Sequence, residues 1–309
     1  MRLLISLGGN ALLRHGDAVT ADNQRESAAH AAMWLAPVIR SHEVVITHGN
    51  GPQLGLLALQ SFSYVGEPSR LDFLGAEAGG MIGYLLEREL RNTLGRDHLF
   101  STLLTQVIVN PQDPAFAKPT KSIGPFYERT HAHQLRQVRG WEFAEFDGRF
   151  RRLVAAPRPL TLLETRNVEI LLQAGSTVIA SGPVPVASLP SGGFHGVEAL
   201  PDKDACAALL ARELNADAFI MLTDVLAAAV NFGKPEQRQI RHATPAMLRA
   251  IEFDQATMGP KIEAGCGFAD ATGKWAAIGA LSDVSRILSG EAGTRIVGSL
   301  PGKMEFWDN

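Results

Sequence analysis

Several features that would point to other classes of protein are missing from this 309-residue chain. It contains only two cysteines, Cys206 and Cys266, which lie far apart and form no group with metal-ligand spacing. We therefore expect buried, free thiols in a reducing compartment rather than disulfides or a zinc site. The net charge of -3 offers no electrostatic basis for binding nucleic acid or an anionic membrane, so we expect neither partner.

Long hydrophobic runs are also lacking. No apolar stretch approaches membrane-spanning length, and the apolar run of residues 3–7 is too short for a signal peptide. We therefore expect a cytoplasmic globular protein. The chain also has no Gly-x-x-x-x-Gly-Lys-Ser/Thr loop, no Gly-x-Ser-x-Gly elbow and no His-Glu-x-x-His motif. Without the first of these motifs, phosphoryl transfer would need a different scaffold from the P-loop fold.

Lysine is scarce, with seven residues against 22 arginines. Three of the seven, Lys121, Lys203 and Lys261, lie in motifs interrupted by proline or flanked by aspartate. One interpretation is codon bias toward arginine, with a few lysines left by chance. The other is that lysine is kept where a compact, mobile ammonium group is needed, as in a clamp on a transferring phosphoryl group.

Short apolar runs recur along the chain and end in small or polar residues. Such β-branched runs are typical of strands buried on both faces of a parallel sheet, and the stretches between them have the patterns and glycine stops of helices. The expected strands cover residues 3–7, 44–47, 177–180, 219–222 and 275–278, and the expected helices cover residues 72–94, 164–174, 203–214 and 261–272. This alternation predicts an α/β sandwich with a largely parallel sheet.

One segment interrupts the alternation. Residues 111–160 contain six prolines, and residues 142–146 and 149–154 flank Asp147-Gly148, a pair that favours a two-residue hairpin turn. We interpret the chain as a single domain, residues 1–309, with residues 111–160 as an inserted lid subdomain.

Two glycine-rich motifs follow expected strands. Gly8-Gly9-Asn10 follows the first, and His48-Gly49-Asn50-Gly51 follows the second. Ligands of parallel sheets bind at this carboxyl edge, and glycines let backbone N–H groups close around an anion. A tight turn is the simpler interpretation of the first motif, and His48 alone favours a structural, hydrogen-bonding role over a catalytic one.

The three lysine motifs each have two interpretations. Lys121 belongs to a proline-rich segment that is either a rigid, solvated loop or a lid that delivers the ammonium group to an anion. Lys203 lies between Asp202 and Asp204 at an expected helix start, which could be a simple cap. Lys261 lies in the first turn of a helix, where the macrodipole disfavours a cation, so a bound polyanion would explain its position.

Taken in order, these segments resemble the carbamate kinases of the amino-acid kinase superfamily. The matching segments span nearly the whole chain: Leu7-Gly8-Gly9-Asn10-Ala11-Leu12, Thr47-His48-Gly49-Asn50-Gly51-Pro52-Gln53, Gly80-Met81-Ile82-Gly83-Tyr84, residues 113–127, Gly196-Val197-Glu198-Ala199, Asp202-Lys203-Asp204, Asn231-Phe232-Gly233-Lys234-Pro235 and Met258-Gly259-Pro260-Lys261. The resemblance implies an open three-layer αβα sandwich with a mainly parallel sheet of about eight strands, assembled as a homodimer.

The resemblance also implies the reaction, a reversible phosphoryl transfer between ATP and carbamate with Mg²⁺. In arginine or purine catabolism it would run from carbamoyl phosphate and ADP to ATP. The implied catalytic residues are Lys121, Lys203 and Lys261, with Asp204 organising the lysines. The implied substrate-binding residues are Gly8, Gly9, Asn10, Gly49, Asn50 and Gly51. The implied nucleotide-binding residues are Thr223, Asp224, Asn231, Phe232, Gly233, Lys234, Pro235, Met258 and Gly259.

Two segments depart from the family pattern. Residues 181–186 read Ser-Gly-Pro-Val-Pro-Val where the family usually has a run of four glycines, which predicts a poorer phosphate nest. Residues 224–228 lack the Asp-Gly that the family often has after Leu-Thr-Asp-Val. Besides an active carbamate kinase, the sequence therefore leaves open a weakened homologue that binds nucleotide or carbamoyl phosphate as a regulatory or complex partner, and a kinase for another small acid.

Overall fold

A computed structural model describes residues 1–309 except 14–15, 66–68, 255–256 and 309. Its centre is a sheet of twelve described strands, in the order β11-β12-β14-β13-β10-β1-β2-β8-β3-β7, with β15 beside β12 and β9 beside β8. The strands are β1 Arg2–Leu7, β2 Glu43–His48, β3 Phe100–Val109, β7 Pro159–Leu162, β8 Thr177–Ser188, β9 Phe194–Gly196, β10 Ala218–Thr223, β11 Ala229–Val230, β12 Arg238–Ala243, β13 Trp275–Ala280, β14 Thr294–Ile296 and β15 Glu305–Phe306. Short strands such as β9, β11 and β15 raise the number above the eight expected.

The middle of the sheet is parallel. β1 pairs with β2 and β10, β2 with β8, β8 with β3, and β10 with β13, all in the parallel sense. This confirms the expected α/β class. The expected strands are buried on both faces, and Leu3, Leu4 and Ile5 of β1 have no exposed surface. Because these strands are parallel, the residues that follow β1, β2 and β10 lie at one edge of the sheet.

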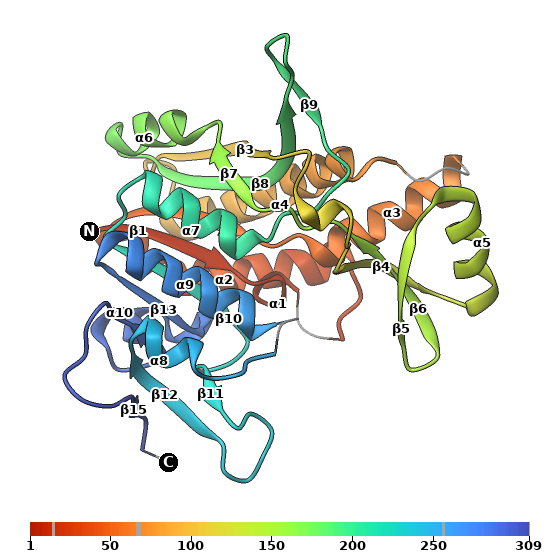
Figure 1. The fold of residues 1–309 in the computed structure, drawn as a ribbon. Helices are drawn as coiled ribbons and strands as arrows, with labels where there is room; N and C mark the ends of the chain where they lie inside the picture. Colours follow the sequence, from red (N-terminus) through yellow and green to blue (C-terminus); the bar gives the residue numbers. More distant parts are fainter. Residues whose placement is uncertain (14–15, 66–68, 255–256, 309) are drawn as a thin grey trace.

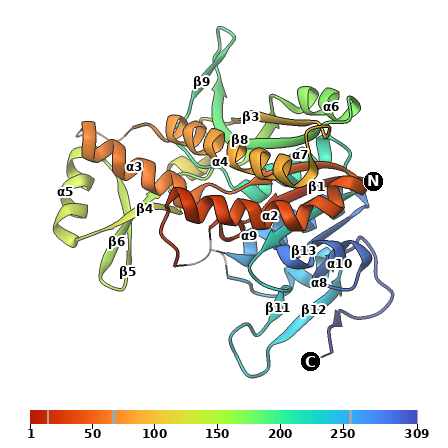
Figure 2. The ribbon, with the colours of Figure 1, turned by 180° about the vertical axis from the view of Figure 1, so that it is seen from behind.

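Helices cover both faces and make the structure a three-layer sandwich (Figure 1; Figure 2). Leu4 packs in one core with helices α6, α7, α8 and α9, whereas Leu3, Ile5 and Leu7 pack in a second core with α2, α4 and α10. This alternation follows from the two-residue period of a strand. The helices are α1 Gly9–Leu12, α2 Ala21–Ser41, α3 Gly51–Val65, α4 Leu71–Leu94, α5 Arg129–Arg139, α6 Thr165–Gln173, α7 Lys203–Glu213, α8 Pro245–Arg249, α9 Met258–Thr272 and α10 Val284–Ser289, with short 3₁₀ turns η1 Pro114–Phe116 and η2 Leu281–Asp283.

Most of the expected helices lie where the sequence placed them. The helix expected over residues 72–94 is α4, and Gly95 with φ of 93° ends it. The start expected at Lys261 is wrong by three residues, since α9 begins at Met258 and takes Pro260 into its first turn. Lys261 nonetheless remains in that turn.

A second, three-stranded sheet lies between β3 and β7 in the chain and projects away from the main sheet (Figure 1). This lid sheet consists of β4 Lys121–Tyr127, β5 Glu142–Phe146 and β6 Arg149–Val154. The expected hairpin is confirmed, because Phe146 pairs with Arg149 and both Asp147 and Gly148 have positive φ, as a two-residue hairpin turn requires. At the base of the lid sheet, side chains of β4 and β6 pack on α3 and α4.

Candidate active site

The most buried charges near the sheet edge form a cluster around Asp204. Lys203 Nζ donates to Asp204 Oδ1 at 2.6 Å, and Lys261 Nζ donates to Asp204 Oδ2 at 2.7 Å. Ser6 Oγ also donates to Oδ1 at 3.1 Å and accepts from Lys203 Nζ at 3.1 Å. We call these four residues the Asp204 cluster. Asp204 is only 3% exposed, so both of its oxygens are held by protein donors rather than by solvent.

Three elements build the Asp204 cluster. β1 supplies Ser6, the first turn of α7 supplies Lys203 and Asp204, and the first turn of α9 supplies Lys261. The Asp202 side chain caps α7 by accepting from the amides of Asp204 and Ala205 at 2.9 and 3.0 Å. Two lysines thus lie at helix N-termini, where the macrodipole repels a cation, and the buried carboxylate between them offsets that cost.

The electrostatics of the cluster favour the charged carboxylate. Burial by itself raises the pKa of Asp204, but the charges and hydrogen bonds of Lys203 and Lys261 outweigh it and hold the pKa below its usual range. Burial lowers the pKa of Lys203, and Lys261 adds to that effect while Asp204 opposes it. The two ammonium groups are therefore fixed close together by a shared anion.

The glycine motifs lie directly beside the cluster. A Cβ atom on Gly49 would lie 3.1 Å from Lys203 Cδ and 3.2 Å from the Gly9 nitrogen, so a side chain there would displace the lysine stem or the neighbouring loop. The Gly49 amide donates to Leu7 O at 3.0 Å, and the Gly8 amide donates to Leu222 O at 2.8 Å. These two amides already donate to backbone carbonyls at the sheet edge, so we no longer expect them to bind an anion. Their glycines permit close backbone approach instead.

The other two glycines of these motifs begin helices. Gly9 starts α1, and Gly51 starts α3, whose residue Leu54 donates to Asn50 O at 2.8 Å. The first amides of a helix have no carbonyl partner within it, so the start of α3 offers donors toward the sheet edge. The side chain of Asn10 lies outside the described part of the structure.

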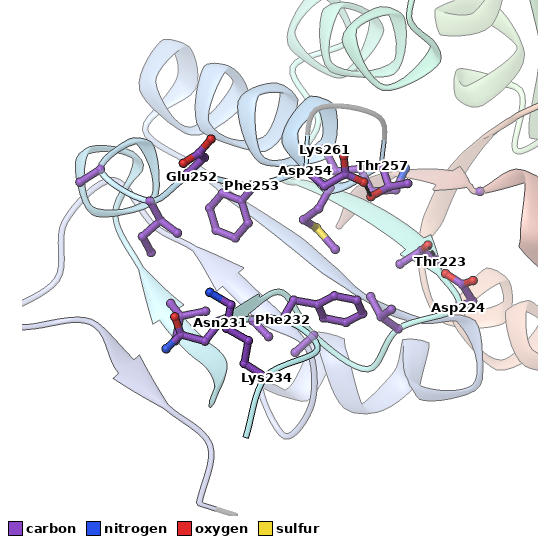
Figure 3. A pocket seen from close by; sticks show the side chains of 18 of the residues that line it. Thr223, Asp224, Asn231, Phe232, Lys234, Glu252, Phe253, Asp254, Thr257 and Lys261 are labelled. Carbon is purple, nitrogen blue, oxygen red and sulfur yellow. Dashed lines mark hydrogen bonds between the residues drawn. The ribbon is translucent and has the colours of Figure 1, made fainter. Parts of the chain in front are cut away.

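A pocket of about 1010 Å³ opens beside the cluster (Figure 3). Its lining comes from the segment after β10, the β11–β12 connection and the segment before α9, together with Gly8, Gly9 and Lys261. We call it the large pocket. Of the residues expected to bind nucleotide, six line it: Thr223, Asp224, Asn231, Phe232, Lys234 and Met258. Gly233, Pro235 and Gly259 are not among its lining residues.

One wall of the large pocket was missed by the sequence analysis. Residues 250–254 and Thr257 line it, and Phe253 is only 8% exposed, whereas Phe232 on the opposite side is 71% exposed (Figure 3). No pattern within residues 250–254 marks them as a site. Their position just before the Met258-Gly259-Pro260-Lys261 motif was the one available signal.

Lys121 lies outside the Asp204 cluster. It begins β4 of the lid sheet, and its Nζ donates to Pro201 O at 3.3 Å and lies 3.9 Å from Asp202 Oδ2. The third lysine therefore lies at the N-terminus of α7, where it contacts the capping Asp202 and not Asp204, although the resemblance implied that Asp204 organises the lysines. Its side chain is 34% exposed, against 13% for Lys261.

The altered residues 181–186 lie within strand β8 rather than in a loop. Ser181 has no exposed surface, and its hydroxyl lies 3.0 Å from His48 Nε2. It fits against Gly83 of α4, where a Cβ atom would lie 2.4 Å from the hydroxyl oxygen. The Ser181 side chain is thus turned into the protein core, so its Cβ does not narrow the large pocket.

His48 connects this core contact to the glycine motif. It is 1% exposed, and burial, with a smaller effect of the Lys203 charge, lowers its pKa to about 4. The ring is therefore neutral near pH 7. Gly49 O, 3.3 Å from Nδ1, can only accept, so Nδ1 carries the hydrogen and Nε2 accepts from Ser181. This arrangement matches the structural role expected for His48.

The second altered segment, residues 224–228, contributes Asp224, Val225 and Ala227 to the lining of the large pocket. Thr223 Oγ1 donates to Asp224 Oδ1 at 3.0 Å, and both residues line the pocket (Figure 3). Ala227 and Ala228 are buried, whereas Leu226 is 55% exposed. The pocket therefore forms without the Asp-Gly that the family often has here.

The described residues lack two features that would point to other functions. They contain no group of three or more histidine, cysteine or carboxylate side chains suited to hold a metal ion. None of the helices built from these residues is long and apolar enough to cross a membrane.

Comparisons with known proteins agree across sequence and structure. The model of the amino acid kinase family matches residues 1–269. The chain is 47% identical to a carbamate kinase of Haemophilus influenzae over 98% of both proteins, and 45% identical to one of Rhizobium meliloti over 97% of this chain and 94% of that protein. The solved structure of carbamate kinase from Giardia lamblia bound to AMP-PNP has a TM-score of 0.89 at 34% identity, covering 96% of this chain and 98% of that one.

Proposed function

Because this chain belongs to the amino acid kinase family and is a carbamate kinase-like phosphotransferase, we propose that it transfers a phosphoryl group reversibly between ATP and carbamate. In catabolism the reaction would run from carbamoyl phosphate and ADP to ATP. The observation that supports this most strongly is the intact Asp204 cluster, whose Lys261 lines the large pocket. That cluster does not favour the alternative of a weakened binding homologue.

In this proposal Lys203 and Lys261 stabilise the phosphoryl group as it passes between the two acceptor oxygens. Phosphoryl transfer needs mainly positioning and compensation of negative charge, and little covalent chemistry from the protein. Asp204 holds both ammonium groups in place before substrate binds, so they need not reorganise during the reaction. Lys121 would add a third positive charge from the lid sheet.

The small substrate would lie at the carboxyl edge of β1 and β2. Gly9, Asn10, Asn50 and Gly51 would supply the donors there, with the N-terminus of α3 favouring a negative charge. Gly8 and Gly49 would contribute by letting the loops and the Lys203 stem approach closely.

The nucleotide would occupy the large pocket. Its base and sugar would lie between the β11–β12 connection, with Asn231 and Phe232, and the wall formed by residues 250–254. Its phosphates would extend toward Gly8, Gly9 and Lys261, which join the pocket to the Asp204 cluster. Gly233, Pro235 and Gly259 would support this site through the backbone of their segments.

Mg²⁺ fits the site as an ion that enters with the nucleotide. The Asp204 oxygens are both occupied by protein donors, and Asp224 and Asp254 are carboxylates on the wall of the large pocket. Mg²⁺ is usually held by one or two carboxylates together with substrate phosphates. When bound, it would neutralise phosphate charge. We further propose that the protein is cytoplasmic and forms a homodimer.

A coupled assay of ATP formation from carbamoyl phosphate and ADP with Mg²⁺ tests the proposed function. We expect turnover in the wild type and its loss in Lys261→Ala. If ADP raises the melting temperature but the wild type shows no turnover, the protein is a nucleotide-binding homologue rather than an active kinase. If only another acyl phosphate supports ATP formation, the acceptor is a different small acid.

A further inference from the structure

Arg152 crosses from the lid sheet to the body of the protein. It lies on β6, is 9% exposed, and donates from Nη2 to Glu198 Oε1 at 3.0 Å. Its guanidinium carbon lies 3.8 Å from the centre of the Trp141 ring, which holds the side chain from the lid side. Glu198 belongs to the segment between β9 and α7, so the ion pair joins two separate parts of the fold.

Glu198 is itself held by the start of α4. Its second oxygen, Oε2, accepts from the Leu71 amide at 2.8 Å. Next to it, Arg70 donates to both oxygens of Asp72 and to Gly196 O at 2.7 Å. The backbone approaches so closely here that a Cβ atom on Gly196 would lie 1.7 Å from Asp72 Oδ2. Residues 196–198 therefore form a fixed point for Arg152.

The register of the lid sheet connects Arg152 to Lys121. Arg152 on β6 pairs with Ile123 on β4, and Lys121 on β4 pairs with Val154 on β6. The Arg152 and Lys121 side chains therefore come from neighbouring strands, at positions that differ by two residues in the register. The chain after β6 continues this connection, because Leu200 donates its amide to Ala155 O at 2.9 Å. Holding Arg152 thus holds the end of β4 from which Lys121 reaches Pro201 O.

Stability alone does not explain a buried arginine at this position. Burial lowers the pKa of Arg152, although Glu198 partly opposes that effect. Its buried Nε has no hydrogen-bond partner among the described residues. Burying a charge with an unsatisfied donor costs free energy, and an apolar side chain over Trp141 would avoid that cost. What the ion pair adds is a defined position for the lid sheet.

We propose that Arg152 is a positioning residue, which acts through Glu198 and the lid sheet to place the Lys121 ammonium group over the start of α7. The proposal deepens the function proposed above and rests on the role given there to Lys121. It assigns Arg152 no contact with substrate.

The variants Arg152→Met and Glu198→Gln test this, with Arg129→Gln as the matched control. Arg129 also makes an ion pair, but with Glu145, so that pair lies wholly within the lid subdomain. We expect both test variants to lower kcat by roughly 10- to 100-fold, because small displacements of catalytic groups cost this much, while the KM for ADP changes by less than about threefold. The kcat of Arg129→Gln should stay within about twofold of the wild-type value.

A double-mutant comparison separates positioning from a general loss of structure. In a Lys121→Ala background, Arg152→Met should lower kcat by less than a further factor of about two, since Arg152 acts through the Lys121 side chain, which is already removed. An equal loss with and without Lys121 would overturn the proposal. The rise in melting temperature caused by ADP shows that each variant retains a folded large pocket, and Arg152→Lys serves as the milder change if Arg152→Met does not fold.

A spectroscopic measurement makes the test independent of activity. The chain has only seven lysines, so reductive methylation with ¹³C-formaldehyde yields few NMR signals, and Lys121→Arg identifies that of Lys121. Arg152→Met and Glu198→Gln should move the Lys121 signal, whereas Arg129→Gln should not. An unmoved signal refutes the positioning role. An inactive wild type in which the signal still moves refutes the proposed function but not the positioning role.

Discussion

The two halves of the proposed lysine clamp are held in different ways. Lys203 and Lys261 lie 2.6 and 2.7 Å from a carboxylate whose side chain is 4% exposed. Lys121 lies 3.9 Å from Asp202, whose side chain is 35% exposed, and belongs to a separate sheet. The first pair is a preorganised part of the core. The position of the third lysine, Lys121, depends on how the lid sheet packs against the body of the protein. The ammonium groups of Lys203 and Lys261 are thus held in place by the sandwich itself. The ammonium group of Lys121 is supplied by the inserted lid sheet.

The largest expected effect is that of Asp204→Asn, which removes the anion shared by the buried lysines. We expect kcat to fall by about 10³-fold or more, because the lysines lose their orientation. The free energy of unfolding should fall by about 3–5 kcal/mol, since two largely buried ammonium groups lose the counter-charge that they share. The coupled assay and denaturant unfolding measure these changes. The exposed pair of Arg249 and Asp270 supplies the control, and Asp270→Asn should alter neither quantity appreciably.

Lys261→Ala and Lys121→Ala should differ in stability although both reduce activity. Each should lower kcat by about 10²-fold or more, because each removes a positive charge that stabilises the transferring phosphoryl group. Lys261→Ala should also lower the free energy of unfolding by about 1.5–3 kcal/mol, since it leaves a buried carboxylate oxygen without its donor. Lys121→Ala should change it by less than about 1 kcal/mol. Equal melting temperatures for the two variants would contradict the division between core and lid.

The pH dependence of stability should report the buried His48. Its folded pKa of about 4 lies below the ordinary 6.5, so below pH 6.5 the unfolded chain binds more protons than the folded one. Stability should therefore fall as the pH drops from about 6.5 to 4, by roughly 3 kcal/mol from this residue. Denaturant titrations of wild type and His48→Asn measure the effect, which should be weaker in the variant. Parallel curves for the two proteins would show that His48 is not the group responsible.

The smallest expected effect is that of Ser181→Ala. The change removes the donor to His48 Nε2 within the core, so the free energy of unfolding should fall by about 1–2 kcal/mol. The Kd for ADP should remain within about twofold, because Ser181 does not line the large pocket. Thermal unfolding and calorimetric titration test this. A marked loss of ADP affinity without a change in melting temperature would restore the view that residues 181–186 form part of the phosphate site.

Much of the fold could be predicted because buried parallel strands and capped helices leave local patterns. The runs ending at Leu7 and Leu222 are strands β1 and β10, and Asp147-Gly148 forms the expected hairpin turn. Short added strands such as β11 and β15 were missed, since two-residue strands carry no period. The wall formed by residues 250–254 was missed for a similar reason, because only its place beside α9 makes it part of the large pocket.

The lysine motifs and glycine turns could be read along the chain, because each is a local arrangement of residue types. Which lysine binds which aspartate could not. Lys203 and Asp204 are neighbours in the chain, but Lys261 reaches Asp204 only because α7 and α9 begin at the same sheet edge, and Lys121 reaches Asp202 only because β4 is held by β6. Likewise, the sequence predicted that Ser181 would weaken a phosphate-binding nest. In the structure its hydroxyl points into the core, where it contacts His48 and packs against Gly83. Local sequence sets the conformation of each segment, whereas contacts between distant segments, and the burial that strengthens them, decide the chemistry of the site.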